Sequence, residues 1–179
     1  IWIPSEFHWE NYSNAVSYIP FLRYTWNTLL ICVLSVAGNV FSASLVAYGF
    51  SRIQWKGRDF FFYLMLGTLV LPPQVTMIPV FIIFRTLRAI DTYVPLVLPS
   101  FFGAPFFIFL LRQFFRGIPE SLSEAARIDG CSEFGIFAKV ILPLSIPALV
   151  TVAIFTFIGT WVDFMNPLIY LQSPEKFTL

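Results

Sequence analysis

The chain has 179 residues, of which 58% are hydrophobic and only 12% are charged, and its mean hydropathy is +0.78. A soluble domain carries about 25% charged residues, so this composition excludes an ordinary water-soluble globule and indicates a membrane protein in contact with lipid. The formal net charge of +1 gives no basis for binding nucleic acid. Cys32 and Cys131 lie far apart and resemble neither a disulfide framework nor a metal site.

Four long runs of the sequence contain no Asp, Glu, Lys, Arg or His. They are 25, 25, 20 and 23 residues long and cover residues 26–50, 60–84, 92–111 and 140–162. A helix needs about 20 residues to cross a hydrocarbon core of about 30 Å, whereas the strands of a barrel are shorter and alternate in polarity. We therefore predict an all-α fold, a polytopic transmembrane helical bundle with four spans.

Prolines break up the second and third of these runs. They stand in the second run at Pro72, Pro73 and Pro79, and in the third at Pro95, Pro99 and Pro105. Each proline removes a backbone donor and tends to kink a helix, and in lipid the freed carbonyls must find partners on neighbouring helices or in water. The pattern predicts broken helices that pack in a bundle, not independent lipid anchors.

The basic residues between the runs predict which side of the membrane each loop faces. Seven of the eleven stand in the two loops at 51–59 and 112–139, which four spans place on one side. The remaining four are Arg23, Arg85, Arg88 and Lys176. Because cytoplasmic loops carry the excess of Lys and Arg, we expect 51–59 and 112–139 to be cytoplasmic. Residues 1–25 and 173–179 are then outer segments that flank a transmembrane domain at 26–172.

A polar segment at 119–139 interrupts the apolar second half of the chain, and its pattern indicates two short helices that meet at a glycine. Ser121 and Glu124 have the spacing of a capping box, in which each side chain bonds the backbone N–H of the other residue. Gly130 is placed to end this first helix in the left-handed conformation. Ser132 follows it and is expected to cap the second helix.

Apolar residues of the second helix have the spacing of one helical face. They are Phe134, Phe137, Ala138 and Ile141. From the residues alone, two interpretations of the polar segment remain open. It is shaped for docking another protein, since small Ala125 and Ala126 stand beside the acid Glu124, which can accept from an arginine. Equally, it is an amphipathic helix that lies on the membrane surface.

The sequence EAARIDG at 124–130, followed by Ile-Leu-Pro at 141–143, resembles the EAA signature of permease subunits of ABC importers. The segments LPPQVTMIPVFIIFRTL, FLLRQFFRGIPESLSEAARIDG and WVDFMNPL extend the resemblance to the sugar-type, maltose-like branch. It covers nearly the whole chain from about residue 26 onward. Two departures stand out: no residue separates the Ile from Leu-Pro, and Val162 replaces the usual Asn of W-N-D-F.

The resemblance implies a MetI-like permease fold in the prokaryotic plasma (inner) membrane, normally with six spans, so one span is expected before residue 1 and one after residue 179. It also implies that the first polar helix is a coupling helix, which sits in a groove of a cytosolic ATPase subunit. The residues that carry this role are Glu124, Ala125, Ala126, Asp129 and Gly130.

The partners that the resemblance implies are two cytosolic ABC ATPase subunits, a second permease subunit and an extracytoplasmic solute-binding protein, with membrane lipid around the bundle. ATP hydrolysis is expected on the ATPase subunits. The chain itself has no G-x-x-x-x-G-K-[ST] phosphate loop. We therefore expect it not to be an enzyme and to need neither a cofactor nor a metal.

A solute path needs polar groups at membrane depth, and the clearest candidates are Asp163 and Asn166 at the outer end of the fourth span. An intramembrane carboxylate is costly and marks a functional site by default. Asp163 also stands close enough to the exit of the span to fix a helix end instead. Weaker candidates are Asn27, Asn39, Gln74 and Thr76.

Together these features predict the permease subunit of an ATP-driven importer for an oligosaccharide or a related polyol. The first alternative is a permease with the same motif for a peptide, an amino acid or another non-sugar solute. The second alternative is a transporter driven by an ion gradient. That class would need charged residues within the spans, and apart from Asp163 the spans have none.

Overall fold

The computed structural model describes residues 9–179, and over this range the chain folds into helices without strands. In chain order the helices are α1 (Glu10–Tyr18), α2 (Phe21–Ser51), α3 (Arg58–Gly67), α4 (Pro73–Thr86), α5 (Val94–Val97), α6 (Pro105–Gly117), α7 (Glu120–Ile128), α8 (Glu133–Ile136), α9 (Leu142–Leu144), α10 (Ile146–Trp161) and α11 (Met165–Tyr170). Turns of 3₁₀ helix cover Thr68–Val70, Leu98–Phe102 and Pro174–Lys176, and a π-helical turn joins α8 to α9 at Phe137–Ile141. The outer segment predicted at 1–25 falls partly on residues 1–8, which lie outside the described range.

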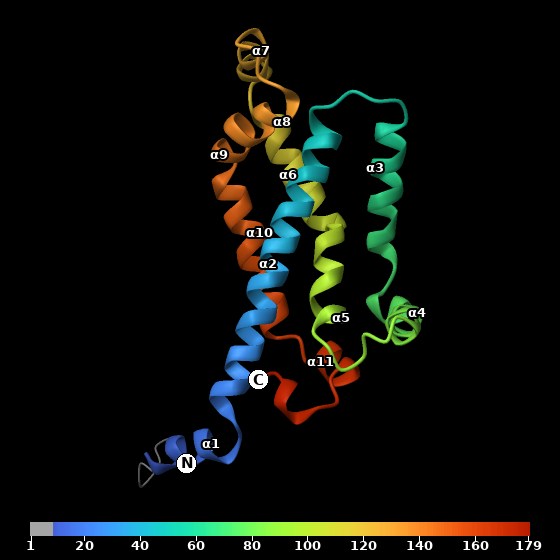
Figure 1. Cartoon of the computed structure of the whole chain (residues 1–179). Coiled ribbons are helices and arrows are strands. Elements are labelled where there is room, and N and C mark those ends of the chain that lie inside the picture. The colour runs from blue at the N-terminus through green and yellow to red at the C-terminus, as the bar shows by residue number, and fades with distance from the viewer. Residues whose placement is uncertain (1–8) are drawn as a thin grey trace, which may run out of the picture.

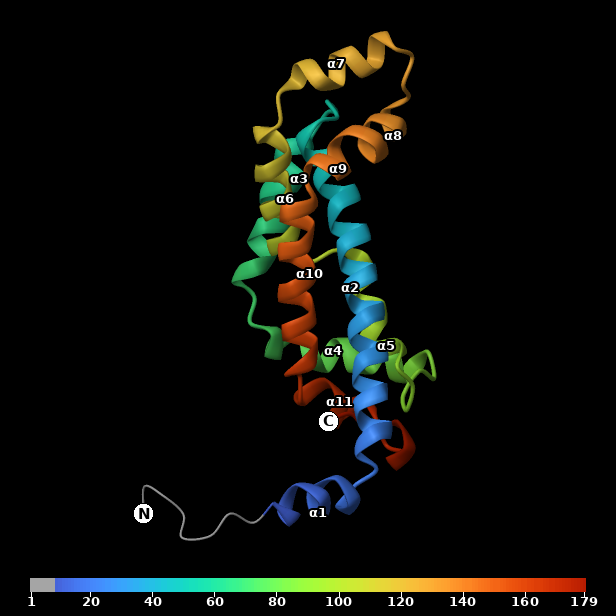
Figure 2. The same cartoon turned by 90° about the vertical axis from the view of Figure 1, so that its left-hand side faces the viewer.

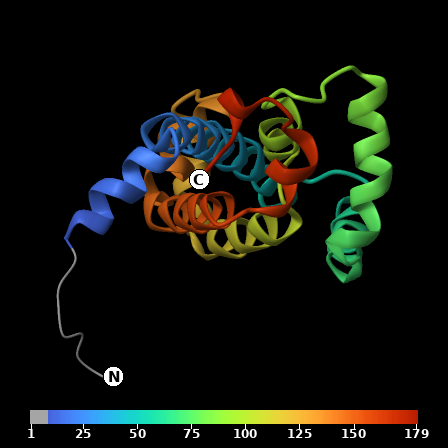
Figure 3. The ribbon, with the colours of Figure 1, turned by 90° about the horizontal axis from the view of Figure 1, so that it is seen from below.

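The helices form an elongated bundle whose two ends carry different elements. Helices α2, α6 and α10 run side by side along its length, and α7 lies across one end (Figures 1 and 2). Helices α1 and α11 and the C-terminus lie at the opposite end (Figure 1). From below, α3 and α4 stand to one side of the group formed by α2, α6 and α10 (Figure 3). Arg112 pairs with Asp59 at 3.5 Å, so the loops at 51–59 and 112–139 lie at the same end, as expected.

Two segments are each long and apolar enough to cross a membrane by themselves: α2 and the stretch Val94–Gly117, which comprises α5 and α6. The other two predicted spans are bent pairs. Helix α3 with its 3₁₀ turn meets α4 at 100°, and the stretch Glu133–Leu144 meets α10 at 78°. When each bent pair counts as one span, the described residues contain the four predicted spans, and the helices are broken as the prolines indicated.

The second span is not one helix over 60–84. Leu71 and Pro72 adopt extended backbone, with ψ of 119° and 135°, because the residue before a proline is disfavoured in the helical region and Pro73 follows Pro72. Helix α4 then leads off almost perpendicular to α3, across the end of the bundle opposite α7 (Figure 2). Pro79 lies inside α4 without ending it, so the proline pair sets the break.

Polar side chains of α2 close the break in the third span. The backbone N–H of Ala104, at the start of α6, donates to Asn39 Oδ1 at 3.4 Å. Asn39 Nδ2 donates in turn to Thr156 Oγ1 of α10 at 3.0 Å, and Ser42 Oγ donates to the Ser100 carbonyl at 3.0 Å. Broken backbone in lipid needs such partners, so Asn39 and Ser42 hold α2, α6 and α10 together around the break.

An apolar cluster fills the part of the bundle that leads to α7. Its buried members are Ala43, Ala47, Tyr48, Ile108, Leu111, Phe115, Ile118, Ile136, Phe137, Ile141, Ala148 and Val152. They come from α2, α6, α8, α10 and the segments that join them. Because one cluster packs these elements against each other, the helices next to α7 are held in fixed positions relative to one another.

Candidate functional sites at the two ends of the bundle

Helix α7 carries the first part of the polar segment and lies across one end of the bundle (Figure 2). It begins at Glu120, directly after Pro119, whose ψ of 133° is extended. The predicted capping box is wrong, since Ser121 lies inside the first turn and no side chain caps the helix. Because Pro119 sets the start of the helix before Ser121, the serine cannot be the N-cap, which is the residue that directly precedes the helix. Glu120 stands in the first turn, where a negative charge is favourable against the helix dipole.

The end of α7 matches the predicted glycine stop. Gly130 has φ of +81°, and the Cys131 N–H reaches back to the Ala126 carbonyl at 2.9 Å. Glycine is the residue that adopts this left-handed conformation without strain. Ser132 Oγ then accepts from the Gly135 N–H at 3.2 Å and caps α8, as predicted. The turn between α7 and α8 is therefore fixed by the backbone conformation of Gly130 and by the hydrogen bond to the Ser132 side chain.

The apolar face predicted for the following helix is wrong at two of its four positions. Phe137 and Ile141 are buried, but Phe134 is 68% exposed and Ala138 is exposed as well. A π-helical turn in this stretch changes the spacing from that of an α-helix. The buried side is therefore made by Ile136, Phe137 and Ile141.

The outer face of α7 combines acids with an apolar side chain. Glu124, Ala125 and Asp129 are exposed, and Ile128 is 87% exposed. Ala126 is half-buried and packs against the apolar cluster, so it attaches α7 to the bundle. The structure thus places the predicted coupling residues other than Ala126 on the exposed surface. The exposed surface of α7 therefore carries two acids and one large apolar side chain.

Charged residues to which the sequence assigned no pairing meet at this end of the bundle. Arg127, inside the motif, donates from Nε to Glu133 Oε1 at 2.8 Å and from Nη1 to Glu120 Oε1 at 3.1 Å. Arg52 at the end of α2 also pairs with Glu120. Tyr48 Oη also donates to Glu133, at 2.8 Å from Oε2. The opposite charges of Glu120, Arg127 and Glu133 were the only sign of this pairing in the sequence. The pairing itself depends on how the chain reverses direction after α7.

At the opposite end of the bundle, Asp163 and Asn166 are brought together after α10. Asp163 Oδ2 accepts from Asn166 Nδ2 at 2.7 Å, and Oδ1 accepts from the Asn166 backbone N–H at 3.2 Å. Both bonds hold the turn between α10 and α11, in which Phe164 is the residue that directly precedes α11. The two residues also line a cleft of about 470 Å³ between α4, α5 and α11. Gln74 and Thr76 of α4, two of the weaker candidates, line the same cleft.

The other two weak candidates hold the fold together. Asn27 Nδ2 donates to the carbonyls of Glu175 and Phe177, each at 2.9 Å, and so attaches the C-terminal segment to α2. Asn39 closes the break before α6 through Ala104, as described above. Neither asparagine lines the cleft that Asp163 borders.

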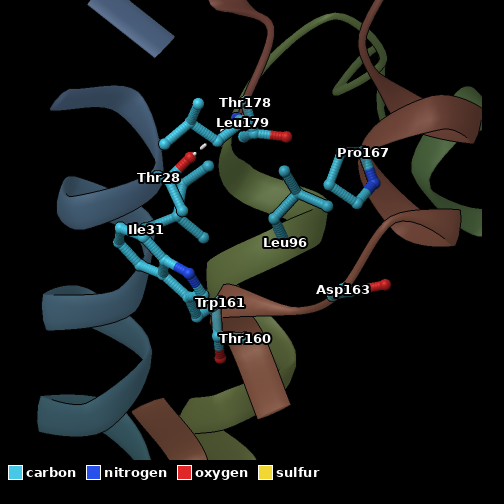
Figure 4. A pocket seen from close by; sticks show the side chains of 9 residues that line it. All are labelled: Thr28, Ile31, Leu96, Thr160, Trp161, Asp163, Pro167, Thr178 and Leu179. Atoms are coloured by element: carbon cyan, nitrogen blue, oxygen red, sulfur yellow. Dashed lines mark hydrogen bonds between the residues drawn. The ribbon is translucent and has the colours of Figure 1, made fainter. Parts of the chain in front are cut away.

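A second, smaller cavity of about 50 Å³ also borders Asp163 (Figure 4). Its lining includes Thr28, Thr160 and Trp161, from α2 and α10. The Leu179 N–H donates to Thr28 Oγ1 at 3.0 Å and joins the C-terminal residues to this lining (Figure 4). Space of this size accommodates about one or two water molecules. Asp163 thus borders open space on two sides although it stands at the end of an apolar span.

Comparison with known proteins shows which family the chain resembles. The family model for the binding-protein-dependent transport system inner membrane component matches residues 38–178. The arabinooligosaccharides transport system permease protein AraQ of Halalkalibacterium halodurans is 39% identical over 160 residues, which are 88% of this chain and 57% of that protein. The polygalacturonan/rhamnogalacturonan transport system permease protein YtcP of Bacillus subtilis is 35% identical over 179 residues, 100% of this chain and 62% of that protein. The alpha-glucoside transport system permease protein AglG of Rhizobium meliloti is 35% identical, over 96% of this chain and 47% of that protein.

A solved structure gives the same answer for the fold. The crystal structure of a bacterial ABC transporter involved in the import of the acidic polysaccharide alginate matches with a TM-score of 0.78 and 30% identity, over 87% of this chain and 55% of that chain. The chain spans about half to three fifths of the length of the relatives that it matches. The predicted all-α transmembrane bundle with a MetI-like permease fold is confirmed. The chain belongs to the binding-protein-dependent transport system inner membrane component family, as its EAA motif indicated.

Proposed function

We propose that the chain is part of the permease subunit of an ATP-driven importer and forms, with a second permease subunit, the path for a carbohydrate. The observation that carries this proposal is α7, an exposed helix with a glycine stop that bears Glu124 at the end of an apolar bundle. The relatives named for arabinooligosaccharides, polygalacturonan and alpha-glucosides, together with the alginate importer, support a carbohydrate as the solute.

Coupling to ATP takes place through α7. The helix sits in a groove of a cytosolic ATPase subunit, where Glu124 accepts from a basic residue and small Ala125 lets the groove approach closely. Asp129 and Gly130 end the helix at the rim of this contact. When two ATPase subunits close on ATP, α7 moves and the bundle changes between inward-facing and outward-facing arrangements by rigid-body motion. The hydrolysis itself takes place on the ATPase subunits, so this chain changes conformation in response to it and is not an enzyme.

The solute passes beside Asp163 and Asn166 in the cleft of about 470 Å³. Carbohydrate hydroxyls both donate and accept hydrogen bonds, and a carboxylate with amide side chains can serve both roles. Each Asp163 oxygen accepts one bond from Asn166 and keeps a lone pair for a further donor. Gln74 adds a second amide to the same lining. The cleft therefore offers several hydroxyl-binding groups within one space.

The end of the bundle with α7 faces the cytoplasm, and the end with the cleft faces outward from the prokaryotic plasma (inner) membrane. The excess of basic residues in the loops at 51–59 and 112–139 supports this orientation. An extracytoplasmic solute-binding protein delivers solute at the outer end, where the segments 1–25 and 173–179 belong. Exposed apolar side chains on the spans are covered by lipid and by the second permease subunit.

Reconstitution tests this proposal. The full-length protein, its partner permease, the ATPase subunits and the solute-binding protein are placed in proteoliposomes with ATP and a panel of oligosaccharides, peptides and amino acids. We expect ATP hydrolysis and uptake to rise with one or more oligosaccharides. Stimulation by peptides or amino acids alone would instead support the non-sugar permease. Uptake driven by an ion gradient without ATP would contradict the importer altogether.

A further inference from the structure

Five side chains form a continuous chain of contacts at the end of the bundle that carries α7, and both ends of this chain lie at the end of α2. In order they are Arg52, directly after α2, Glu120 and Arg127 of α7, Glu133 of α8, and Tyr48 of α2. Glu133 Oε1 accepts from Arg127 Nε at 2.8 Å, and Oε2 accepts from Tyr48 Oη at 2.8 Å. Glu120 connects Arg127 to the end of α2, since it accepts from Arg127 Nη1 at 3.1 Å and from Arg52. We call these five residues the α7 clamp.

The two α2 members of the α7 clamp are anchored independently of α7. Tyr48 and Arg52 are four residues apart and therefore lie on the same side of α2. The Tyr48 ring is buried and packs on Phe137, with 5.1 Å between ring centroids. The Arg52 side chain is 5% exposed, and its Nη2 donates at 2.5 Å to the carbonyls of Phe115 and Ile118 at the end of α6. Both anchors are thus fixed within the bundle.

Helix α7 is held at both of its ends. Glu120 is its first residue and Arg127 stands in its last turn, so the α7 clamp contacts both turns. A helix of 9 residues is not stable by itself, and the loops on either side could absorb a push applied to it. Isolated exposed ion pairs contribute little to stability, but pairs that share a buried arginine in one network act together. The α7 clamp is therefore suited to keep α7 at a fixed position.

The α7 clamp separates two tasks within one short motif. It contains two arginines and two glutamates, so its formal charges cancel. Glu124 and Asp129 form no ion pair among residues 9–179 and remain as acids on the exposed face. Arg127 belongs to the same motif, yet its Nε and Nη1 donate to Glu133 and Glu120, the two acids of the α7 clamp. The acids are left for a partner, while the arginine attaches the helix to its own bundle.

We infer that the α7 clamp transmits the displacement of α7 to α2. This inference rests on the proposed function, in which an ATPase subunit moves α7. The α7 clamp joins α7, the start of α8 and the adjoining end of α2 into one body. A displacement applied at Glu124 then moves α2, and with it the helices packed on α2, instead of bending the loops around α7. Tyr48, Arg52 and Arg127 are positioning residues, which touch neither solute nor nucleotide.

Hydrogen exchange tests whether the α7 clamp holds the helix. Tyr48→Phe removes one bond and keeps the ring on Phe137, and Arg127→Met removes two bonds. In the full-length protein purified with its partner subunits, we expect exchange of the α7 and α8 amides to rise about tenfold for Tyr48→Phe and further for Arg127→Met. The control is Arg116→Met, which removes an exposed arginine that forms no ion pair among residues 9–179. Wild-type exchange in both clamp variants would overturn the inference, and so would an equal rise in the control.

Transport per ATP hydrolysed tests the transmission itself. We expect Arg127→Met to keep wild-type co-purification of the ATPase subunits and to lose about tenfold in solute moved per ATP. Arg127→Lys keeps the charge but reaches only one carboxylate, so it should recover part of this ratio. A wild-type ratio in Arg127→Met overturns the inference, and so does loss of the ATPase subunits in that variant, since Arg127 would then be a docking contact. Failure of the wild-type protein to bind any ATPase subunit overturns the proposed function instead, and the exchange result still decides whether the α7 clamp holds α7.

Discussion

Asp163 accepts two hydrogen bonds from one residue, Asn166: one from the side-chain amide at 2.7 Å and one from the backbone N–H at 3.2 Å. The pair therefore holds the turn before α11 at the same place where it lines the cleft. A change at Asp163 acts on the local fold as well as on any solute in the cleft. Two substitutions with different effects on these two bonds are needed to separate these roles.

The substitution Asp163→Ala removes the charge and both bonds from Asn166, whereas Asp163→Asn removes the charge but keeps one oxygen, which can still accept from the Asn166 backbone N–H. We expect Asp163→Ala to lose about 1 kcal/mol of stability and Asp163→Asn to lose less, because it keeps one of the two bonds. Both variants should take up less solute in proteoliposomes, since the carboxylate is proposed to contact it. Wild-type uptake by Asp163→Asn would limit Asp163 to holding the turn before α11.

The left-handed stop after α7 is tested by Gly130→Ala and Gly130→Val. A Cβ at this position meets no atom within 4 Å, so the effect comes from the φ of +81° alone. The backbone strain is about 1–2 kcal/mol for an ordinary residue and larger for a β-branched one. Gly117→Ala is a matched control, because Gly117 also has open space around it and its φ is not positive. We expect lower co-purification of the ATPase subunits only for the Gly130 variants, and equal results for Gly117→Ala and Gly130→Ala would contradict this.

Cysteine labelling in intact cells tests the orientation in the membrane. Gln54 and Thr86 are both exposed, at opposite ends of the bundle. The background carries Cys131→Ser because Cys131 is partly exposed, while Cys32 is buried. We expect an impermeant thiol reagent to label Thr86→Cys from outside, and Gln54→Cys only after the cells are permeabilised. The reverse pattern would place α7 outside the cell.

Asp91 connects two segments at the end of the bundle opposite α7. Its side-chain oxygens accept from Ser173 Oγ at 2.5 Å, from the backbone N–H groups of Ser173 and Gln172 at 2.9 Å and 3.0 Å, and from Lys176 Nζ at 2.9 Å. These bonds, those from Ser173 above all, hold the pKa of Asp91 well below its ordinary value of 3.8. A carboxyl with a lowered pKa in the folded state stabilises the fold above its unfolded pKa, and this stabilisation is lost as pH falls through the folded pKa.

The difference in thermal midpoint between the wild type and Asp91→Asn should therefore be constant from about pH 8 to about pH 5 and should shrink only below about pH 4. Thermal unfolding of the purified complex across this range measures it. A second variant, Ser173→Ala, removes only the hydroxyl partner and should show a smaller difference with the same pH dependence. A difference that already shrinks above about pH 5 would contradict the bonding of Asp91.

Features with a local or a membrane-imposed cause could be predicted from the sequence. The spans were predictable because the bilayer thickness fixes the length of an apolar run. Gly130 was predictable because the left-handed φ that ends a helix favours glycine. Ser132 was predictable because the first backbone N–H groups of a helix need an acceptor, which a serine side chain supplies. The start of α7 was not, since Pro119 and Ser121 both favour a helix start and the spacing does not say which one sets it.

Features that depend on distant contacts could not be predicted. Pro72 and Pro73 indicated a break, but the 100° between α3 and α4 depends on how α4 packs. Asp163 and Asn166 were predictable as a pair, whereas the wall that faces them comes from α4 and follows from that bend. The α7 clamp joins Tyr48 of α2 to residues far along the chain, and no pattern within a single segment contains that contact.

The docking of α7 is tested first by Glu124→Ala. Removing one member of a desolvated charge pair costs about 2–5 kcal/mol, largely because the partner charge is left unpaired. We expect the variant to lose most of its ATPase subunits on purification, or to hydrolyse ATP without solute uptake. Glu175→Ala removes an exposed acid from the other end of the bundle and should leave both properties unchanged. Normal membrane insertion is expected of both, since neither residue lies in a span.

The most direct measurement is a cross-link from α7 itself. A photo-activatable phenylalanine derivative is placed at Ile128, which is 87% exposed beside the acids of α7, in the full-length protein within its native membrane. The same residue at Phe164, which is 70% exposed at the opposite end of the bundle, is the control. We predict that illumination joins position 128, but not position 164, to a cytosolic subunit that binds ATP. Cross-links from position 128 to lipid alone would mean that α7 lies on the membrane surface, and the coupling role would be wrong.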